Sequence, residues 1–255
     1  MERKIQRYGW IPDLPDHRDH IYAAPPEVLA VLPTKADLRP KCPPVLDQGQ
    51  LGSCTANAIA NAFRFDEMKQ KIAKPLAPSR LFIYYNERAM EGTIRSDSGA
   101  QIRDGIKSIA KLGVCAETEW PYDIAKFAQK PPAKAFKDAL QHQALSYQRV
   151  IQTLSQMKGC LAAGYPFVFG FSVYETFESN AVAKNGIVPM PAPKEKNLGG
   201  HAVLAVGYDD STQYVTVMNS WSDNWGDKGY FYLPYAYIND ANLASDFWTV
   251  RIVET

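Results

Sequence analysis

The sequence predicts an α+β protein, with a mostly helical first half followed by a strand-rich second half. Segments predicted to be helical fall between residues 53 and 163, the first of them free of breakers, and apolar, β-rich runs follow one another after residue 166. Such a chain is expected to form two lobes with a cleft between them. The expected boundaries are an N-terminal arm at residues 1–32, a helical lobe at 33–145 and a strand-rich lobe at 146–255.

The N-terminal arm is expected to be irregular, because residues 1–32 are proline-rich and show no sustained period of 2 or 3.6. Its histidines His17 and His20 lie beside acidic residues and could bind a metal, but a solvated charged turn is the expected reading. No apolar segment follows the charged N-terminus, so a signal peptide is not predicted. The chain is expected to be cytoplasmic, or exported without a visible signal.

The remaining elements follow from local periodicity and breakers. Helices are predicted near residues 53–65, 79–89, 100–112, 134–144 and 150–163. Strands are predicted at residues 167–173, 202–208, 214–218, 229–233 and 247–252. The proline-bearing segment 177–197 is predicted to be a surface loop.

Composition narrows the functional classes. Hydrophobic residues make up 46% and charged residues 22% of the chain, and the formal net charge is +1. This balance predicts no nucleic-acid or anionic-membrane partner. The four cysteines form no C-x-x-C pair and have no histidine at zinc-ligand spacing, so neither a metal nor another cofactor is expected. They are also too few for a disulfide scaffold.

One cysteine has the setting of a nucleophile. Cys54 follows a glycine-bearing loop and opens a predicted helix, where the helix dipole and free N–H groups favour a thiolate. His201 follows two glycines at the start of a predicted strand, so its ring can face a cleft. Asn219 ends another strand, and its carbonyl oxygen could orient an imidazole ring. Taken singly, each residue has an alternative interpretation. Cys54 could be a buried apolar residue, His201 a core or surface histidine with its hydrogen bonds satisfied, and Asn219 a turn residue.

Three motifs together resemble the papain family of cysteine proteases. They are Gln48-Gly49-x-x-Gly52-Ser53-Cys54, Gly200-His201-Ala202-Val203-x-Ala205-Val206-Gly207-Tyr208, and Asn219-Ser220-Trp221-x-x-x-Trp225-Gly226. Their order matches the family, and the gap from Cys54 to His201 is 201 − 54 = 147 residues, within the roughly 130–150 expected. The resemblance implies a two-lobe papain-like fold with a helical first lobe, a β-barrel-like second lobe and the active site in the cleft.

The resemblance also implies residue roles. Cys54 would attack the scissile carbonyl, His201 would exchange protons with it, Asn219 would orient His201, and Gln48 would stabilise the oxyanion. Substrate would be bound by Gly99, Ala100, Gly170, Gly200 and Trp221. With Gly199 and Ile102, the glycines 170 and 200 would form a roomy, apolar and uncharged specificity pocket that accepts bulky apolar or aromatic residues.

The chain departs from the family at one disulfide. Leu51 and Asp97 stand where the family usually has two cysteines that pair with each other. Both ends of the bridge are missing together, which fits a reducing compartment or a bacterial-type branch.

The expected function is therefore that of a monomeric thiol peptidase, and more specifically an endopeptidase, acting on peptide or protein substrates through a thioester acyl-enzyme. Two alternatives stay open: a related amide hydrolase or acyl transferase, and an inactive papain-like binding module. The extended segment 8–16 of the arm is expected to pack near the cleft and restrict access, or only to add stability.

Overall fold

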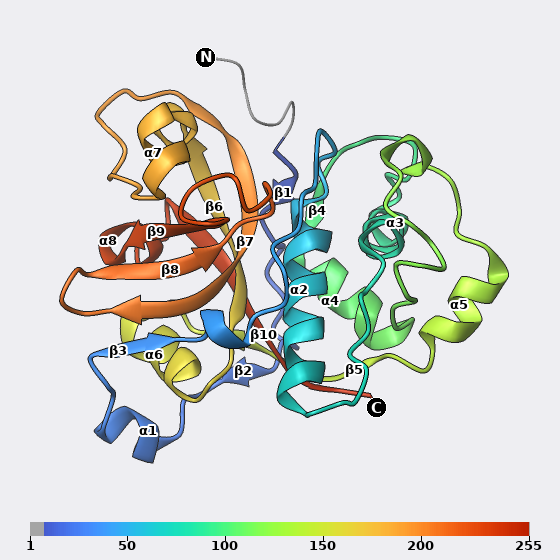
Figure 1. The fold of residues 1–255 in the computed structure, drawn as a ribbon, viewed down its shortest axis with the longest axis horizontal. Helices are drawn as coiled ribbons and strands as arrows, with labels where there is room; N and C mark the ends of the chain where they lie inside the picture. Colours follow the sequence, from blue (N-terminus) through green and yellow to red (C-terminus); the bar gives the residue numbers. More distant parts are fainter. Residues whose placement is uncertain (1–7, 255) are drawn as a thin grey trace.

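Two lobes lie side by side with the long helix α2 (Cys54–Lys69) between them (Figure 1). The structure is a computed structural model and describes residues 8–254. Helix α2 packs against strands β7 (Asn197–Asp209) and β10 (Ala244–Val253) on one side and against the helical lobe on the other. Its first ten residues are all buried, because both lobes cover the helix. The predicted two-lobe α+β fold is confirmed.

The helical lobe contains α3 (Arg80–Glu91), α4 (Ile102–Lys111) and α5 (Ala133–Ala139). Helix α3 begins at a cap, where the Ser79 hydroxyl accepts a hydrogen bond from the N–H of Phe82 (3.1 Å). The predicted helix from residue 100 begins two residues later than expected. Ala100–Gln101 instead form strand β4, which pairs in parallel with strand β1 (Trp10–Ile11) of the N-terminal arm.

A single eight-stranded sheet forms the second lobe, in the order β2-β5-β10-β6-β7-β8-β9, with β3 pairing with β7. Its other strands are β2 (Ile21–Tyr22), β3 (Lys35–Asp37), β5 (Ala144–Val150), β6 (Phe167–Tyr174), β8 (Tyr214–Met218) and β9 (Tyr230–Pro234). All pairs are antiparallel except β2 with β5. Among the described residues β2 and β9 do not pair, so the sheet is open and the barrel-like form expected for this lobe is not closed.

Short elements cover the sheet and correct parts of the sequence reading. The segment predicted as a surface loop contains a 3₁₀ turn (Glu175–Glu178) and helix α7 (Asn180–Asn185). Strand β5 was missed because its residues are mostly half-buried and polar, and the two neighbouring predicted helices were drawn too long. The structure has α6 at Leu154–Ala162, α8 at Tyr235–Ile238 and α1 at Pro26–Ala30, with 3₁₀ turns at Arg39–Lys41 and Ile124–Lys126.

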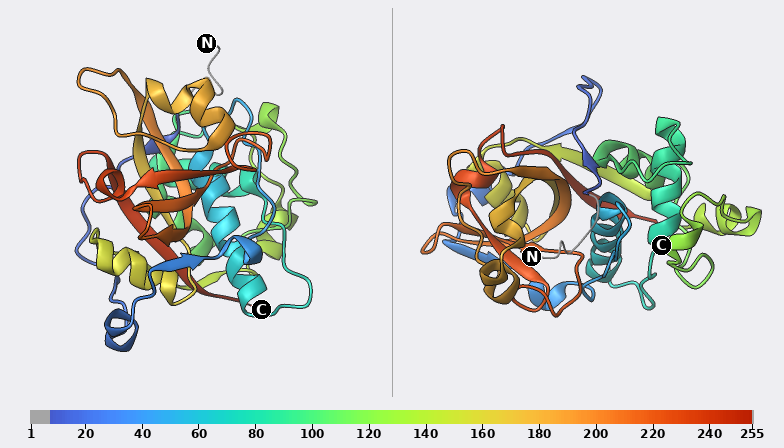
Figure 2. Two further views of the ribbon diagram at one scale, coloured as in Figure 1. Left: turned by 60° about the vertical axis from the view of Figure 1, so that its left-hand side comes forward. Right: turned by 90° about the horizontal axis from the view of Figure 1, so that it is seen from above.

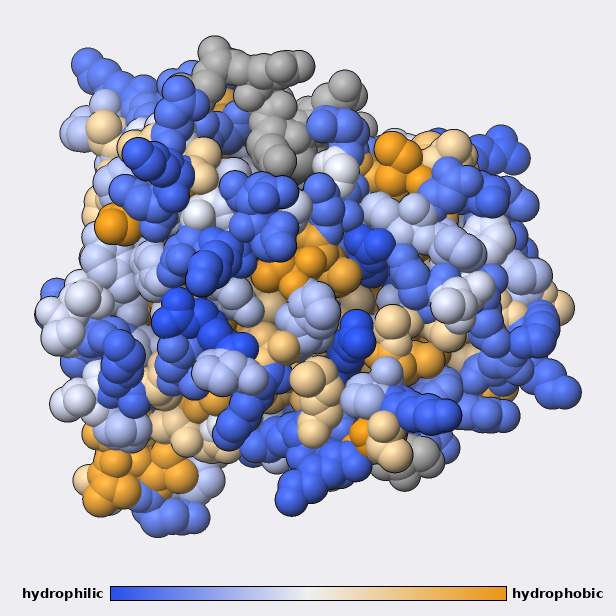
Figure 3. Space-filling model, viewed as in Figure 1, coloured by the Kyte–Doolittle hydropathy of each residue, from blue (hydrophilic) through white to orange (hydrophobic). Residues whose placement is uncertain are grey.

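The face seen in Figure 3 is largely hydrophilic, with several apolar patches, one of them at the lower left over α1. Val31, the residue that follows α1, is 77% exposed. No helix among residues 8–254 is both long and apolar enough to cross a membrane.

From Tyr8 onward, the N-terminal arm passes between the lobes at β1 and then runs along the far side of the view in Figure 1 toward β2, as the two turned views show (Figure 2). It crosses β6 and β7 near Trp10 before reaching β5 at Ile21, which lies in parallel register with Arg149. A cluster of buried aromatic rings packs between these strands and the turns beside them: Phe171, Phe177, Trp221, Trp225 and Phe231. The arm and the ring cluster together enclose the region around His201.

Candidate active site

Cys54 is the first residue of α2 and is fully buried. The backbone N–H of Ala202 donates to its sulfur (3.4 Å), and the N–H groups of Gly9 and Thr55 also point at it. Because Ala202 follows His201 directly on β7, this bond joins the start of α2 to the strand that carries His201. Partial positive charge from the helix terminus and these N–H groups converges on the thiol.

The imidazole of His201 is held by Asn219, as the sequence predicted for the pair. Asn219 Oδ1 lies 2.8 Å from His201 Nε2 and also accepts from the N–H of Ser220 (2.8 Å), which fixes the amide orientation. Since Oδ1 only accepts, Nε2 carries the proton and Nδ1 is left as the basic nitrogen. Trp221 covers this bond: it is fully buried, and its ring centroid lies 5.2 Å from that of His201.

The Gln48 amide is buried in the loop that leads to Cys54. Its Oε1 accepts from the Ser220 hydroxyl (2.7 Å), and its Nε2 donates to the carbonyl of Leu51 (2.9 Å). An amide nitrogen has two hydrogens, so one stays available after the bond to Leu51. The orientation required for an oxyanion donor is therefore set by Ser220, the neighbour of Asn219.

Burial changes the protonation of the two central groups. Desolvation raises the pKa of the Cys54 thiol to about 12, and the three backbone N–H groups only partly offset it. Desolvation also lowers the pKa of His201 to about 4, although the bond to Asn219 favours the charged ring. With the arm in place, the thiol and the imidazole are both neutral at pH 7.

Asp97 occupies one of the positions where the family usually has a bridging cysteine, and it forms hydrogen bonds there. Its carboxylate accepts from the N–H of Gly52 (3.1 Å to each oxygen) and from the hydroxyl of Tyr84. The Tyr84 hydroxyl in turn accepts from the N–H of Gly99 (3.2 Å). A polar clip therefore ties the nucleophile loop to α3 and to the predicted substrate strand.

The arm covers this centre with its backbone. The carbonyl of Gly9 accepts from the N–H of Ala100 (2.8 Å), and the ring of Tyr8 lies 5.8 Å from that of His201. The contact is too close for side chains: a Cβ on Gly9 would fall 1.7 Å from the Gly52 carbonyl oxygen, and one on Gly99 would fall 2.1 Å from the Gly9 carbonyl oxygen. Two predicted substrate positions, Gly99 and Ala100, thus contact the arm.

The other two predicted glycines border a hollow that holds Trp10. A Cβ on Gly170 would lie 1.9 Å from the Trp10 ring, and one on Gly200 would lie 2.5 Å from it. The indole Nε1 donates to the Asp246 carboxylate (3.1 Å) at the inner end of this hollow. The prediction of an uncharged pocket is therefore wrong, because the Asp246 carboxylate forms a hydrogen bond with the Trp10 ring that occupies the hollow.

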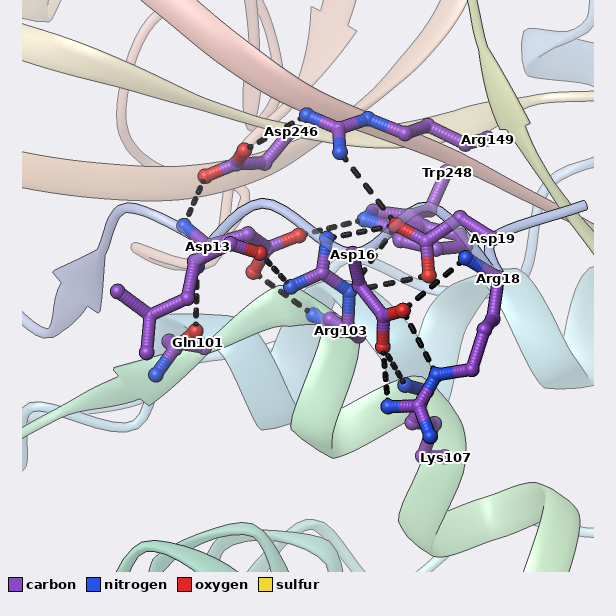
Figure 4. Close-up of polar contacts among 11 residues, drawn as sticks. Asp13, Asp16, Arg18, Asp19, Gln101, Arg103, Lys107, Arg149, Asp246 and Trp248 are labelled. Atoms are coloured by element: carbon purple, nitrogen blue, oxygen red, sulfur yellow. Dashed lines mark hydrogen bonds and ion pairs between the residues drawn. The ribbon is translucent and has the colours of Figure 1, made fainter. Parts of the chain in front are cut away.

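Beyond Trp10, carboxylates anchor the arm to both lobes (Figure 4). Asp13 accepts from the N–H of Arg103 (3.0 Å) and from Trp248 Nε1 (2.8 Å), while its own N–H donates to Asp246 (2.8 Å). Further along, Asp19 forms a buried ion pair with Arg103 (2.6 Å). The acidic run that could have suggested a metal site is thus engaged with arginine, and no metal-ligand cluster is found among the described residues.

Sequence reasoning named the central residues but missed Asp246 and Asp97 as contacts. Asp246 has a positive φ of 60° and sits where β10 shifts register against β6. A bulge of this kind redirects a side chain and leaves no periodic signal in the sequence. For Asp97, a signal was present in the sequence: Leu51 and Asp97 together replace the two cysteines of the family's usual disulfide, so another contact could be expected at that position.

Comparison with known proteins agrees with this geometry. The family model described as papain family cysteine protease matches residues 32–250. An uncharacterized peptidase C1-like protein of Acanthamoeba polyphaga mimivirus is 44% identical over 272 aligned residues, covering 97% of this chain and 88% of the relative. Cathepsin B-like cysteine proteinase 3 of Ostertagia ostertagi is 33% identical over 133 residues, covering 51% of this chain and 72% of the relative.

A solved structure extends the likeness over the whole chain. The crystal structure of xylellain, a cysteine protease from Xylella fastidiosa, is 46% identical with a TM-score of 0.90 and covers 98% of both chains. The chain therefore belongs to the papain family of cysteine proteases and is a thiol-dependent peptidase.

Proposed function

We propose that the protein is an endopeptidase in which Cys54 is the nucleophile, His201 its base and Asn219 the residue that orients the base. One observation carries this. The hydrogen bond between Asn219 Oδ1 and His201 Nε2 leaves Nδ1 as the basic nitrogen, and the N–H of Ala202, which follows His201 on β7, donates to the Cys54 sulfur. All these side chains come from one chain, which supports action as a monomer on peptide or protein substrates.

The reaction follows from these positions. The thiol proton passes to His201 Nδ1, and the sulfur attacks the scissile carbonyl carbon. Gln48 Nε2 and the N–H of Cys54 stabilise the oxyanion, and each such donor typically lowers the barrier by on the order of 3 kcal/mol. His201 then protonates the leaving amine nitrogen, which leaves a thioester. Finally His201 takes a proton from water, the hydroxide attacks the thioester, and the acid product departs.

The N-terminal arm, residues 1–32, acts in this proposal as a blocking segment. Its residues Gly9 and Trp10 contact four of the five predicted substrate-binding positions, and Tyr8 contacts the fifth, Trp221 (ring centroids 6.2 Å). By excluding water it also keeps the Cys54 thiol and the His201 ring neutral, although the attacking form is a thiolate. Release of the arm would readmit water and favour the ion pair.

Labelling tests the nucleophile. A thiol-directed epoxide is expected to modify Cys54, and Cys54→Ala should lose both the label and the cleavage of a peptide blocked at both ends. The other three cysteines are free and serve as internal controls when the site is mapped by mass spectrometry. Label retained in Cys54→Ala would refute the nucleophile. Cleavage that requires a free terminus would refute the endopeptidase assignment.

A single methyl group tests the arm. Gly9→Ala should push the arm away from Gly52, because its Cβ has no space there, and should increase both labelling of Cys54 and peptidase activity several-fold. Gly92→Ala is the matched control: it adds a methyl into open space at the end of α3, at a positive φ of 73°. Unchanged activity in Gly9→Ala would mean that the arm only stabilises the fold.

A further inference from the structure

Tyr122, in the segment between α4 and α5, lies beside the loop that leads to Cys54. Its hydroxyl donates to the main-chain carbonyl of Gln48 (2.9 Å). Because this uses its only hydrogen, the Tyr122 oxygen accepts in its contact with the Ser53 hydroxyl (2.5 Å). Gln48 carries the proposed oxyanion amide, and Ser53 immediately precedes Cys54. One hydroxyl group therefore joins both ends of the loop that forms the proposed oxyanion site.

Arg80, at the start of α3, fixes the position of the tyrosine ring. The central carbon of its guanidinium lies 3.8 Å from the Tyr122 ring centroid, a cation–π contact, and its Nη2 pairs with Glu117 (2.8 Å). Its Nη1 donates to the main-chain carbonyl of Asp47 (2.9 Å) and to Asn57 Oδ1 (3.2 Å). The ring is therefore held by a group that also contacts the loop and helix α2.

The Gln48 main chain is held from two sides. From the strand-rich lobe, the carbonyl of Ser220 accepts from the Gln48 N–H (2.9 Å). From the helical lobe, the Tyr122 hydroxyl binds the Gln48 carbonyl. The next residue, Gly49, has a positive φ of 59°, and a Cβ there would meet open space, so packing does not hold the loop at that point. The orientation of Gln48 Nε2 therefore depends on the contacts from both lobes.

We propose that Tyr122 is a positioning residue for the reaction, which holds Gln48 Nε2 and the Cys54 N–H where both donate to the oxyanion. The inference rests on the proposed endopeptidase function and adds a residue to its site. Without the hydroxyl, the Gln48 carbonyl and the Ser53 hydroxyl lose a shared partner, and the loop is held from one lobe only. A displacement of about 1 Å can lower a rate on the order of a hundredfold, and loss of a whole oxyanion donor has a similar effect.

Removal of the hydroxyl tests this role, because Tyr122→Phe keeps the ring that Arg80 contacts. In the full chain carrying Gly9→Ala, Tyr122→Phe should lower kcat for a blocked peptide about tenfold and change KM less than about twofold. Tyr235→Phe is the matched control: this residue is also half-buried and its hydroxyl donates to Asp210 (2.8 Å), so kcat should be unchanged. An equal loss of kcat in both variants, or no loss in Tyr122→Phe, would overturn the proposal.

Combination with Gln48→Ala separates positioning from a general loss of structure. If Tyr122 acts through Gln48, its effect on kcat should shrink to about twofold or less in a chain that already carries Gln48→Ala, because residues that act as a unit are non-additive. A loss that stays about tenfold there would refute the role.

Alkylation of Cys54 by iodoacetamide provides a readout without an oxyanion, since the sulfur displaces iodide at a saturated carbon. Its rate should be the same with and without Tyr122→Phe. A slower alkylation in Tyr122→Phe would place the effect of the tyrosine on the nucleophile itself and would contradict the proposal.

An ester substrate keeps the test independent of peptide cleavage. With a blocked amino-acid nitrophenyl ester, the Cys54 sulfur attacks the carbonyl carbon through the same oxyanion, nitrophenolate leaves, and water hydrolyses the thioester. If Tyr122→Phe and Gln48→Ala lower kcat/KM for the ester non-additively while no blocked peptide is cleaved, Tyr122 keeps its role and the endopeptidase proposal fails. If blocked peptides are cleaved but the two losses are additive, the endopeptidase proposal stands and the role of Tyr122 fails.

Discussion

The proposed catalytic centre and the hollow that holds Trp10 both contact the N-terminal arm, but they are built differently. In the centre, side chains of fixed identity meet through ordinary elements: a helix start for Cys54, a strand for His201 and a strand end for Asn219. In the hollow, absent side chains and a register shift form the site: Gly170 on β6 is in register with Ser245 on β10, and Asp246 follows at the shift. The proposed centre thus depends on residue types, which a sequence motif records, and the hollow depends on backbone geometry, which a motif does not record.

The largest effect that would test this contrast is expected at Asn219. Asn219→Ala should lower kcat by at least about a hundredfold, because His201 loses the acceptor that fixes its tautomer and ring orientation. The loss should come from kcat rather than KM, and it is measured with steady-state kinetics on a blocked peptide.

A buried asparagine elsewhere provides the control. Asn61 on α2 is 4% exposed and its Nδ2 contacts the sulfur of Met218 (3.2 Å). Asn61→Ala should lower the free energy of unfolding by about 1–2 kcal/mol with kcat nearly unchanged. A comparable loss of kcat in both variants would mean that Asn219 acts through stability.

This contrast also explains how far the sequence could predict the structure. The strands β6, β7 and β8 are continuous apolar runs and were placed to within a few residues, except that β7 begins earlier, at Asn197. The proposed catalytic residues could be named from the sequence because their motifs combine residue type with spacing. Strand β4 was predicted as helix because its partner is the arm, and pairing between residues 10 and 100 has no local signal. The shift at Asp246 was invisible for the same reason.

An intermediate effect is expected at Asp97, which joins the nucleophile loop to the substrate strand. Asp97→Ala should lower kcat about tenfold, because Gly52 and Tyr84 lose a shared acceptor and the loop before Cys54 is no longer held. Asp97→Asn, which still accepts, should recover much of the loss. Hydrogen bonds to a charged group typically contribute about 1.5–3 kcal/mol, so unfolding should also become easier in Asp97→Ala.

Asp123 provides the control, because its carboxylate also accepts a backbone hydrogen bond but lies in a different turn from the proposed active site. Asp123 accepts from the N–H of Ala125 (3.1 Å) at an exposed turn. Asp123→Ala should leave kcat unchanged. If Asp97→Asn were as slow as Asp97→Ala, the negative charge rather than the hydrogen-bond pattern would be the essential feature, and the clip would need reinterpretation.

The smallest effect concerns how pH acts on the docked arm. Burial, and next the charge of Asp246, raise the pKa of Asp13 from 3.8 to about 6, while Arg103 opposes the rise. Glu91 also lies near enough to interact with Asp13, and burial raises its pKa to about 7. The docked arm therefore binds more protons than the released arm. The contribution of Asp13 to docking is complete below about pH 4 and is lost as pH rises through about 6.

The Asp13→Asn variant isolates this contribution, because asparagine does not titrate. The ratio of Cys54 alkylation rates, unmodified chain over Asp13→Asn, should rise several-fold between pH 4.5 and 7.5, since the ionisation of the thiol itself cancels in the ratio. The bonds that asparagine cannot reproduce with Trp248 and Arg103 shift the ratio by a constant and do not change its slope. A flat ratio would contradict the assignment. The same ratio can be measured with Asp246→Asn present in both chains. A rise that persists there would attribute the pH dependence to burial of Asp13, whereas loss of the rise would attribute it to repulsion between the two carboxylates.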